Sequence, residues 1–289
     1  MSGYAHPEVL VDADWVERHA GDPKVRIVEV SEDESLYEKG HIPGAVALSW
    51  TRELRDPVRR DFVSREGFSA LMSRVGIAND STVVLYGDNN NWFATYAFWL
   101  FKYYGHDDVR ILDGGRKKWE ADGRPLTTEK PSYPATRYQA SEPLRELRAY
   151  RDDILQRLGD LALVDVRSWE EYIGERVAMP HLPNEGAQVG GRIPGAVHIP
   201  WGLNVREDGT FKSRDELEEL YRSRGITPDC EVVTYCRIGE RASMAWFALK
   251  YLLGYQRVRN YDGSWTEWGN AVGVPVEKGE PVPPAAAAR

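Results

Sequence analysis

The sequence contains very little cysteine. Only Cys230 and Cys236 occur among 289 residues, which is too few for a disulfide framework. Both lie on what we predict to be one β-strand, where a rise of roughly 3.3 Å per residue places their Cα atoms about 20 Å apart. A disulfide requires Cα atoms about 4.4–6.8 Å apart, so the two cannot pair with each other. We therefore expect a cytoplasmic protein with unbridged thiols, and a structural role for Cys230.

Long apolar runs and a surplus of positive charge are also missing. No run approaches the roughly 20 apolar residues of a membrane-spanning helix, and residues 1–15 lack the basic start and apolar core of a secretory signal. The net charge of −8 and the pI near 5.4 argue against nucleic acid or an anionic membrane as a partner. His181 and His198 have no Cys or His partner at ligand spacing, so we expect no metal and no other cofactor.

An internal repeat is present instead. Residues 64–68, Ser-Arg-Glu-Gly-Phe, correspond to residues 213–217, Ser-Arg-Asp-Glu-Leu, at an offset of 149 positions. The same offset relates four more pairs of segments or residues: 83–86 and 232–235, Gly105 and Gly254, 113–114 and 262–263, and Trp119 and Trp268. Chance similarity does not keep its register over five landmarks, so the chain consists of two copies of one domain.

Each copy alternates predicted strands with predicted helices. The short apolar runs at 25–30 and 161–166 are typical of buried parallel strands. Apolar residues at helical spacing predict helices over 68–75 and 217–224, and residues 213–216 carry a capping-box signature. This alternation predicts an α/β fold in which each copy is a mainly parallel sheet flanked by helices.

The composition along the chain predicts four segments. We expect a first domain over 1–130, a Pro-containing polar linker over 131–148, a second domain over 149–276 and a disordered Pro/Ala tail over 277–289. The second copy also carries 15 extra residues before its Ile-Pro-Gly block, at about 176–190. Such an insertion is either a substrate loop or a plain surface excursion.

The residue types that carry chemistry are concentrated in one loop of the second copy. A β-run ends at Cys236, a short loop follows, and a helix begins near Ala242. In such a turn the backbone N–H groups and the positive end of the helix point to one place. Together with Arg237 and Arg241 they predict an exposed thiolate of lowered pKa, which is a nucleophile at neutral pH. The first copy has Gly87 at the equivalent position, so we expect one active site per chain.

Neighbouring residues have predicted supporting roles. Gly239 allows the loop to turn tightly. Glu240 would weaken an anion site if it pointed inward, so we expect it to point outward or to pair with an arginine. Asp165 and Arg167 favour an internal brace over a catalytic pair, and Arg167 is also a candidate substrate-binding residue. Asp88, with the asparagines that follow it, either lines the cleft or caps a turn.

Three stretches of the sequence resemble a known family. Residues 37–45, Tyr-Glu-Lys-Gly-His-Ile-Pro-Gly-Ala, and 258–268, Val-Arg-Asn-Tyr-Asp-Gly-Ser-Trp-Thr-Glu-Trp, are similar to the two signatures of the tandem-domain rhodaneses. The loop 236–241, Cys-Arg-Ile-Gly-Glu-Arg, is similar to the six-residue active loop of the members that use thiosulfate. The resemblance covers roughly 8–276. It implies two tandem rhodanese-like domains with an inactive first copy, an active site at their interface, and transfer of sulfane sulfur through a Cys236 persulfide to cyanide or a thiol.

Two positions depart from the pattern of the thiosulfate-using members. Ile238 stands where they have a lysine, and Glu171, four residues after Arg167, stands where they have an arginine. The resemblance implies that both cations hold the anionic donor, which leaves the donor open. We predict thiosulfate, bound by residues 237–241 and Arg167, because mercaptopyruvate-using relatives typically begin the loop Cys-Gly-Ser-Gly. The alternative is a 3-mercaptopyruvate sulfurtransferase.

Two other classes of function are less favoured. Cysteine-dependent phosphatases use a similar cradle with the pattern Cys-x5-Arg, but Cys236 and Arg241 form the shorter Cys-x4-Arg. The shorter loop should suit a single sulfur atom and crowd the oxygens of a phosphate. A non-catalytic binding module is the other possibility, and the intact loop around Cys236 argues against it.

Overall fold

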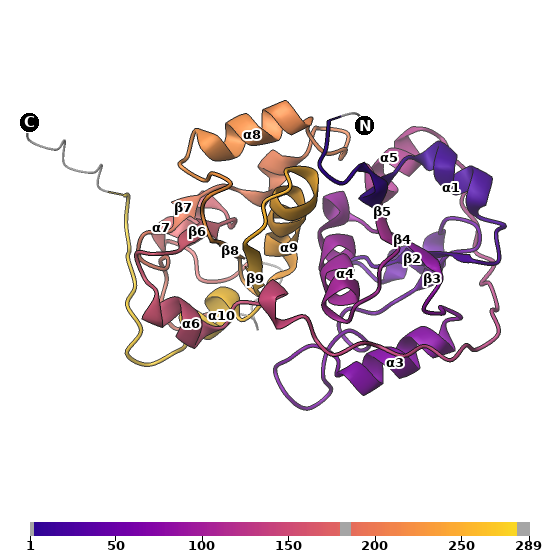
Figure 1. Ribbon diagram of the computed structural model, residues 1–289, viewed down its shortest axis with the longest axis horizontal. Helices are drawn as coiled ribbons and strands as arrows, with labels where there is room; N and C mark the ends of the chain where they lie inside the picture. Colours follow the sequence, from indigo (N-terminus) through magenta and orange to yellow (C-terminus); the bar gives the residue numbers. More distant parts are fainter. Residues whose placement is uncertain (1–2, 180–185, 282–289) are drawn as a thin grey trace, which may run out of the picture.

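Each half of the chain folds around its own parallel β-sheet (Figure 1). The structure is a computed structural model and describes residues 3–179 and 186–281. The strand order is β1-β5-β4-β2-β3 in the first sheet and β7-β6-β8-β9 in the second, and every neighbouring pair is parallel. The strands are Leu10–Val11 (β1), Val25–Glu29 (β2), Val46–Ala47 (β3), Thr82–Tyr86 (β4), Val109–Leu112 (β5), Ala162–Asp165 (β6), Val197–His198 (β7), Val232–Tyr235 (β8) and Val258–Tyr261 (β9).

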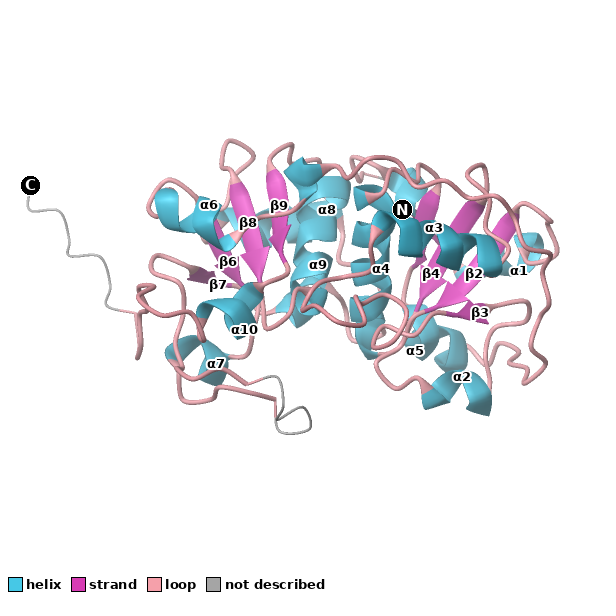
Figure 2. Ribbon diagram, turned by 90° about the horizontal axis from the view of Figure 1, so that it is seen from below, coloured by secondary structure: helices cyan, strands magenta, loops and turns pink. Residues whose placement is uncertain are grey.

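Helices lie on both sides of each sheet (Figure 2). The α-helices are Ala13–His19 (α1), Ser35–Lys39 (α2), Arg65–Arg74 (α3), Trp92–Tyr103 (α4), Gly115–Ala121 (α5), Arg151–Gln156 (α6), Trp169–Ile173 (α7), Arg214–Arg222 (α8), Glu240–Phe247 (α9) and Ser264–Trp268 (α10). Shorter turns of helix are Pro7–Val9 (η1), Asn89–Asn91 (η2), Arg145–Leu147 (η3), Trp201–Asn204 (η5) and Ala248–Leu252 (η6). The predicted α/β class with two similar domains is confirmed.

The predicted capping box is present at the start of α8. The Ser213 side chain accepts a hydrogen bond from the Glu216 backbone N–H, and the Glu216 carboxylate accepts one from the Ser213 backbone N–H. Leu217, Leu220 and Tyr221 form the buried face of the helix, as their spacing predicts. The structural counterpart in the first domain, α3, begins in the same way with Ser64 as its cap. Each cap satisfies N–H groups that a helix start leaves without partners within the helix.

Two helices, α4 and α9, form the contact between the domains (Figure 1). All residues of α9 are buried, as are all residues of α4 except Lys102. A helix buried all round needs partners on every side, and here each helix has its own sheet on one side and the other helix on the opposite side. Phe98 of α4 packs against Phe247 of α9 with ring centroids 4.9 Å apart. One continuous core therefore runs through both domains.

A clasp of charged residues also joins the domains. Arg148, at the end of the linker, donates to both carboxylate oxygens of Asp262 at 2.8 and 2.9 Å, and to Asp61 of the first domain at 2.9 Å. Arg60 of the first domain donates to the backbone oxygen of Asp262 at 3.2 Å. Asp262 lies immediately after β9. The clasp therefore holds the first domain against the carboxyl end of the second sheet, where the active loop begins after β8.

The ends of the predicted segments differ from the structure. The tail predicted from residue 277 begins too early, because Glu277 pairs with Arg192 through backbone and side chain and Gly279 N–H bonds to Ile173. At the other end of the chain, the N–H groups of Ala5 and His6 bond to the oxygens of Leu252 and Tyr251 at 2.9 and 3.0 Å, so this part of the predicted first domain contacts the second. Residues 282–289 of the predicted tail lie outside the described residues.

Candidate active site

Cys236 is the first residue after β8, and its sulfur lies in a tight loop. The backbone N–H of Gly239 donates to Sγ of Cys236 at 3.1 Å. Gly239 adopts a φ of +96°, and a Cβ there would lie 2.6 Å from Cα of Asp262. Only glycine can therefore adopt this turn, and the turn places the start of α9 next to the sulfur. The predicted cradle is present in the geometry.

A second turn, at the start of α10, fixes the backbone of the loop. Ser264 adopts a φ of +49°, uncommon for a residue with a side chain. Its Oγ accepts the N–H of Cys236 at 3.0 Å and donates to the oxygen of Tyr261 at 2.5 Å. The N–H groups of Trp265 and Thr266 bond to the oxygens of Cys236 and Arg237, each at 3.0 Å. The sequence analysis did not identify Ser264 as a site residue. The available signal was a difference between the copies: residues 262–264 are Asp-Gly-Ser, whereas the equivalent residues 113–115 are Asp-Gly-Gly.

The sulfur is buried, which corrects the prediction of an exposed, acidic thiolate. Cys236 has no exposed surface. Burial raises the pKa of the thiol, and the charge of Glu240 raises it further, while Arg241 and the N–H groups of Ala242 and Gly239 act in the opposite direction. The sequence showed the donors around the sulfur, but it did not show that the first domain covers the loop.

Glu240 points into the site and pairs with an arginine. Its carboxylate lies 3.2 Å from the guanidinium of Arg237 and 4.0 Å from that of Arg241, and its Oε2 is 3.5 Å from Sγ of Cys236. The predicted arginine pairing is confirmed, and the outward alternative is wrong. Both arginines predicted to flank the thiol are thus engaged with carboxylates near the sulfur.

Glu171 is the counter-ion of Arg241. The fork of Arg241 donates to both oxygens of Glu171, at 2.8 and 3.0 Å, and both side chains are almost fully buried. Burial alone would raise the pKa of Glu171, but the hydrogen bonds and the charge of Arg241 outweigh it and hold the pKa at about 2. Glu171 thus neutralises a buried cation of the active loop.

The pair of Glu171 and Arg241 makes the free energy of unfolding depend on pH in the acidic range. The pKa of Glu171 falls from an ordinary 4.5 to about 2 on folding, so its contribution is complete above pH 4.5 and is lost as the pH falls toward 2; such a shift is worth about 3 kcal/mol. We expect Glu171→Gln to lower the free energy of unfolding at pH 7 and to flatten its decline between pH 4.5 and 2.5. Denaturant titrations would measure both, with the exposed Glu175→Gln as the control. An equally steep decline in Glu171→Gln would contradict the assignment.

The hydrogen-bond partners of Arg167 lie outside the active loop. Its guanidinium donates to Asp165, with the shortest contact at 2.6 Å, and to the oxygen of Gly191 at 2.6 Å, and it stacks over the ring of Trp265 at 4.5 Å. The predicted internal brace is confirmed by these contacts. The substrate-binding role stays a prediction, and none of these partners belongs to the active loop.

The first domain closes the site. Arg55, Arg60, Asp61, Phe93 and Tyr96 of the first domain line a small cavity whose other wall is formed by Ile238 and Glu240. The side chain of Ile238 is nearly buried there. The loop that carries Cys236 is therefore covered by the domain that has Gly87 at the position equivalent to the cysteine.

The equivalent loop of the first domain has no room for a side chain at the position of the cysteine. A Cβ on Gly87 would lie 2.1 Å from the oxygen of Val30. Asn91 occupies the place of the Ser264 hydroxyl, since its Oδ1 accepts the N–H of Gly87 at 2.9 Å. Asp88 accepts the N–H groups of Glu32 and Asp33 at 2.7 and 3.0 Å. Its side chain makes no cap bond to η2, the turn that follows it, so both hypotheses for this residue stay predictions.

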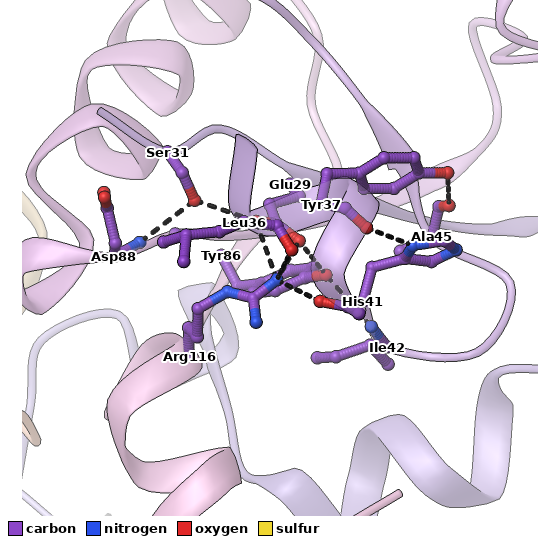
Figure 3. A network of polar contacts seen from close by, with 12 residues as sticks. Glu29, Ser31, Leu36, Tyr37, His41, Ile42, Ala45, Tyr86, Asp88 and Arg116 are labelled. Atoms are coloured by element: carbon purple, nitrogen blue, oxygen red, sulfur yellow. Dashed lines mark hydrogen bonds and ion pairs between the residues drawn. The ribbon is translucent and has the colours of Figure 1, made fainter. Parts of the chain in front are cut away.

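A buried polar network lies behind that loop (Figure 3). Arg116 donates to both oxygens of Glu29 at 2.9 Å, and the hydroxyl of Tyr86 donates to Glu29 at 2.5 Å. Glu29 corresponds to Asp165 in the repeat, and Arg116 stands where the second domain has Trp265. Each domain thus neutralises a buried carboxylate at the end of its first long strand, but the arginine comes from a different position.

The insertion predicted at 176–190 is described only at its flanks. Its residues 180–185, which include His181, lie outside the described residues. The oxygen of Val189 accepts the indole N–H of Trp265 at 2.9 Å, so this flank of the insertion rests on the helix that fixes the active loop. The substrate-loop hypothesis and the surface-loop hypothesis for this insertion both stay predictions.

The chain has two similar domains, each with a parallel sheet, and the cysteine loop of the second domain is covered by the first. The rhodanese-like domain family matches the chain twice, at residues 12–122 and 150–271. The chain belongs to the rhodanese family. None of the described helices has both the length and the apolar character needed to cross a membrane.

Relatives of known name agree with this assignment. "Sulfur carrier protein TtuD" of Thermus thermophilus is 61% identical, over 96% of this chain and 99% of the relative. "Putative thiosulfate sulfurtransferase" of Saccharopolyspora erythraea is 56% identical, over 93% of this chain and 96% of the relative. Rhodanese domains together with these names indicate a sulfurtransferase.

Solved structures with a similar fold include an enzyme of sulfur metabolism. The anaerobic ergothioneine biosynthesis enzyme from Chlorobium limicola, in complex with trimethyl histidine, has a TM-score of 0.86 at 30% identity, over 97% of this chain and 72% of that one. A structure of EanB with a cysteine persulfide and ergothioneine has a TM-score of 0.85 at 29% identity, over 97% of this chain and 73% of that one.

Proposed function

We propose that this protein moves sulfane sulfur from thiosulfate to cyanide or a cellular thiol, through a persulfide on Cys236. The observation that carries the proposal is the position of Sγ at the end of β8, with the N–H of Gly239 directed at it from 3.1 Å. The start of α9 adds the partial positive charge of a helix N-terminus at the same point. These groups act against the burial that raises the thiol pKa, and they would stabilise negative charge on a persulfide.

The surroundings of the sulfur support an anionic donor. Arg55 and Arg60 bring two cations from the first domain to the cavity wall opposite Ile238. The active loop has the neutral Ile238 at one position, and the charge of its Arg241 is neutralised by Glu171. Arg55 and Arg60 supply the positive charge that the loop therefore lacks. Cations that face the negative charge developing on sulfite, the leaving group from thiosulfate, also lower the barrier to its departure. The names of the relatives point to the same donor.

The phosphatase alternative is less consistent with the geometry. In a Cys-dependent phosphatase the arginine that ends the loop must bind the substrate's oxygens. Here the fork of Arg241 is bound to Glu171 at 2.8 and 3.0 Å. A non-catalytic binding module would not require the N–H of Gly239 to face a thiol.

Steady-state kinetics with two donors would test the donor assignment. We expect a larger kcat/KM for thiosulfate than for 3-mercaptopyruvate, with a high KM for thiosulfate. Changing Ile238 to Lys should lower that KM roughly fivefold, because one added cation facing an anionic donor contributes about 1 kcal/mol. The neutral Ile238→Met is the matched control and should leave KM unchanged.

The contrary outcome is equally specific. A larger kcat/KM for 3-mercaptopyruvate would reject thiosulfate as the donor and support the mercaptopyruvate alternative. The persulfide on Cys236 is common to both donors, so it would be unaffected by that result.

A further inference from the structure

Glu240 is the charged group in contact with the sulfur. It is 1% exposed, it is the first residue of α9, and its Oε2 lies 3.5 Å from Sγ of a cysteine with no exposed surface. A thiol at this distance can donate its hydrogen to the carboxylate. Burial of a carboxylate is costly unless cations compensate it, and here Arg237 at 3.2 Å provides the compensation.

Within the active loop and its ion-pair partner Glu171, the charges balance only while Cys236 keeps its proton. Two cations, Arg237 and Arg241, face two carboxylates, Glu240 and Glu171. Ionisation of the thiol would add a third negative charge in a region closed to water. The direction of the thiol pKa, raised by burial and by Glu240, agrees with this balance. The resting thiol therefore needs a base before it can attack, and one base is in contact with it.

We propose that Glu240 is the general base that takes the proton of Cys236 when the sulfur donor reacts. This inference rests on the proposed function. It assigns a catalytic role to a residue that charge considerations alone would count as unfavourable in an anion site.

The chemical step balances as follows when thiosulfate is the donor. The proton of Cys236 moves to Oε2 of Glu240, and the electron pair left on Sγ forms a bond to the sulfane sulfur. The bond between the sulfane sulfur and the sulfonate breaks, and its electron pair leaves with sulfite. Sulfite then takes the proton from Glu240 and departs as hydrogen sulfite, which leaves an anionic persulfide on Cys236 and an ionised Glu240.

Proton transfer also moves a negative charge. The charge leaves Glu240 and appears on Sγ, 3.5 Å away, so the total charge that the donor meets is unchanged. The charge then lies on the atom that attacks the donor. After sulfite has carried the proton away, the ionised Glu240 disfavours the return of an anion to the loaded cysteine.

Several titratable or charged groups surround Glu240 and bear on its pH dependence. From its own loop and helix these are Cys236, Arg237 and Arg241, and from the first domain, across the cavity, they are Arg55, Arg60, Asp61 and Tyr96. The arginines stay charged at every pH of interest, and the pKa of the thiol is raised by its burial and by the charge of Glu240.

The test compares wild type with Glu240→Gln and with the double variant Glu240→Gln/Arg237→Met. The double variant removes one charge of each sign, so the net charge near the thiol stays that of wild type while the base is lost. Persulfide formation is followed in single turnovers with thiosulfate, by mass, from pH 5.5 to 9.5. Alkylation by iodoacetamide over the same range measures the titration of the thiol independently of any donor.

We expect both variants to load sulfur about 100-fold more slowly than wild type at pH 6.5. They should regain rate as the pH rises through the range in which alkylation shows the thiol ionising, while wild type changes little. Loading within about threefold of wild type at pH 6.5, or an equal loss at every pH, would overturn the role of Glu240 as a base.

The wild-type arm separates this inference from the proposed function. If wild type acquires sulfur from 3-mercaptopyruvate or inorganic polysulfide but not from thiosulfate, the proposed donor fails, and the same variants are compared with the donor that loads. If wild type acquires sulfur from none of the three, both the proposed function and the role of Glu240 are overturned.

Discussion

Replacing Cys236 with Ser should reduce sulfur transfer to background, a loss on the order of 10⁴-fold or more. A serine hydroxyl keeps the size of the site but is far too weakly acidic to form the nucleophile, and its oxygen cannot carry a persulfide. Incubating the wild-type protein with a sulfur donor should add about 32 Da at Cys236, the mass of one sulfur of a persulfide. Peptide mapping would locate the added mass.

The chain provides its own control for this experiment. Cys230 lies in a turn before β8, where its sulfur contacts the oxygen of Gly225 at 3.7 Å and no helix start faces it in the described structure. We expect it to acquire no sulfur, and Cys230→Ser to retain activity. An active Cys236→Ser protein, or stable loading of Cys230 in place of Cys236, would contradict the assignment of the nucleophile.

Changing Gly239 to Ala should lower kcat/KM about 100-fold, because displacement of a reactive group by about 1 Å has an effect of that size. The added Cβ would lie 2.6 Å from Cα of Asp262, a backbone atom that cannot rotate away. The loop must therefore move, and the N–H that faces Sγ from 3.1 Å moves with it.

Gly225 offers a matched comparison. It has a φ of +78°, the same left-handed region, but a Cβ there would meet no described atom within 4 Å. Gly225→Ala should therefore share the backbone strain, about 1 kcal/mol of stability, and leave kcat/KM unchanged. Thermal unfolding and steady-state kinetics on both variants would separate strain from collision. Equal activity of the two variants would show that the position of the Gly239 N–H is unimportant.

The fold was predictable because its signals are local or repeated. Apolar runs mark the buried strands, and Ser213 and Glu216 mark the start of a helix. The offset of 149 positions shared by five landmarks shows that one architecture is used twice. The nucleophile was predictable for a related reason: a cysteine between a strand and a helix stands at the carboxyl end of a parallel sheet, where its position follows from the chain order.

The partners of the charged residues were not predictable in the same way. Arg241 pairs with Glu171, 70 positions away, and Arg148 pairs with Asp262, 114 positions away. No periodic pattern links such residues, because a long side chain chooses its partner only after the backbone has folded. The burial of Cys236 was missed for a similar reason, since the cover comes from the first domain.

The contact between Gly87 and Val30 limits what substitution can do in the first copy. A Cβ on Gly87 would lie 2.1 Å from a carbonyl oxygen. A cysteine introduced there by one substitution would not fit, because the strand end and the turn held by Asn91 would have to move as well. A second active site in this chain would therefore require redesign of the loop backbone and not only a change of side chain.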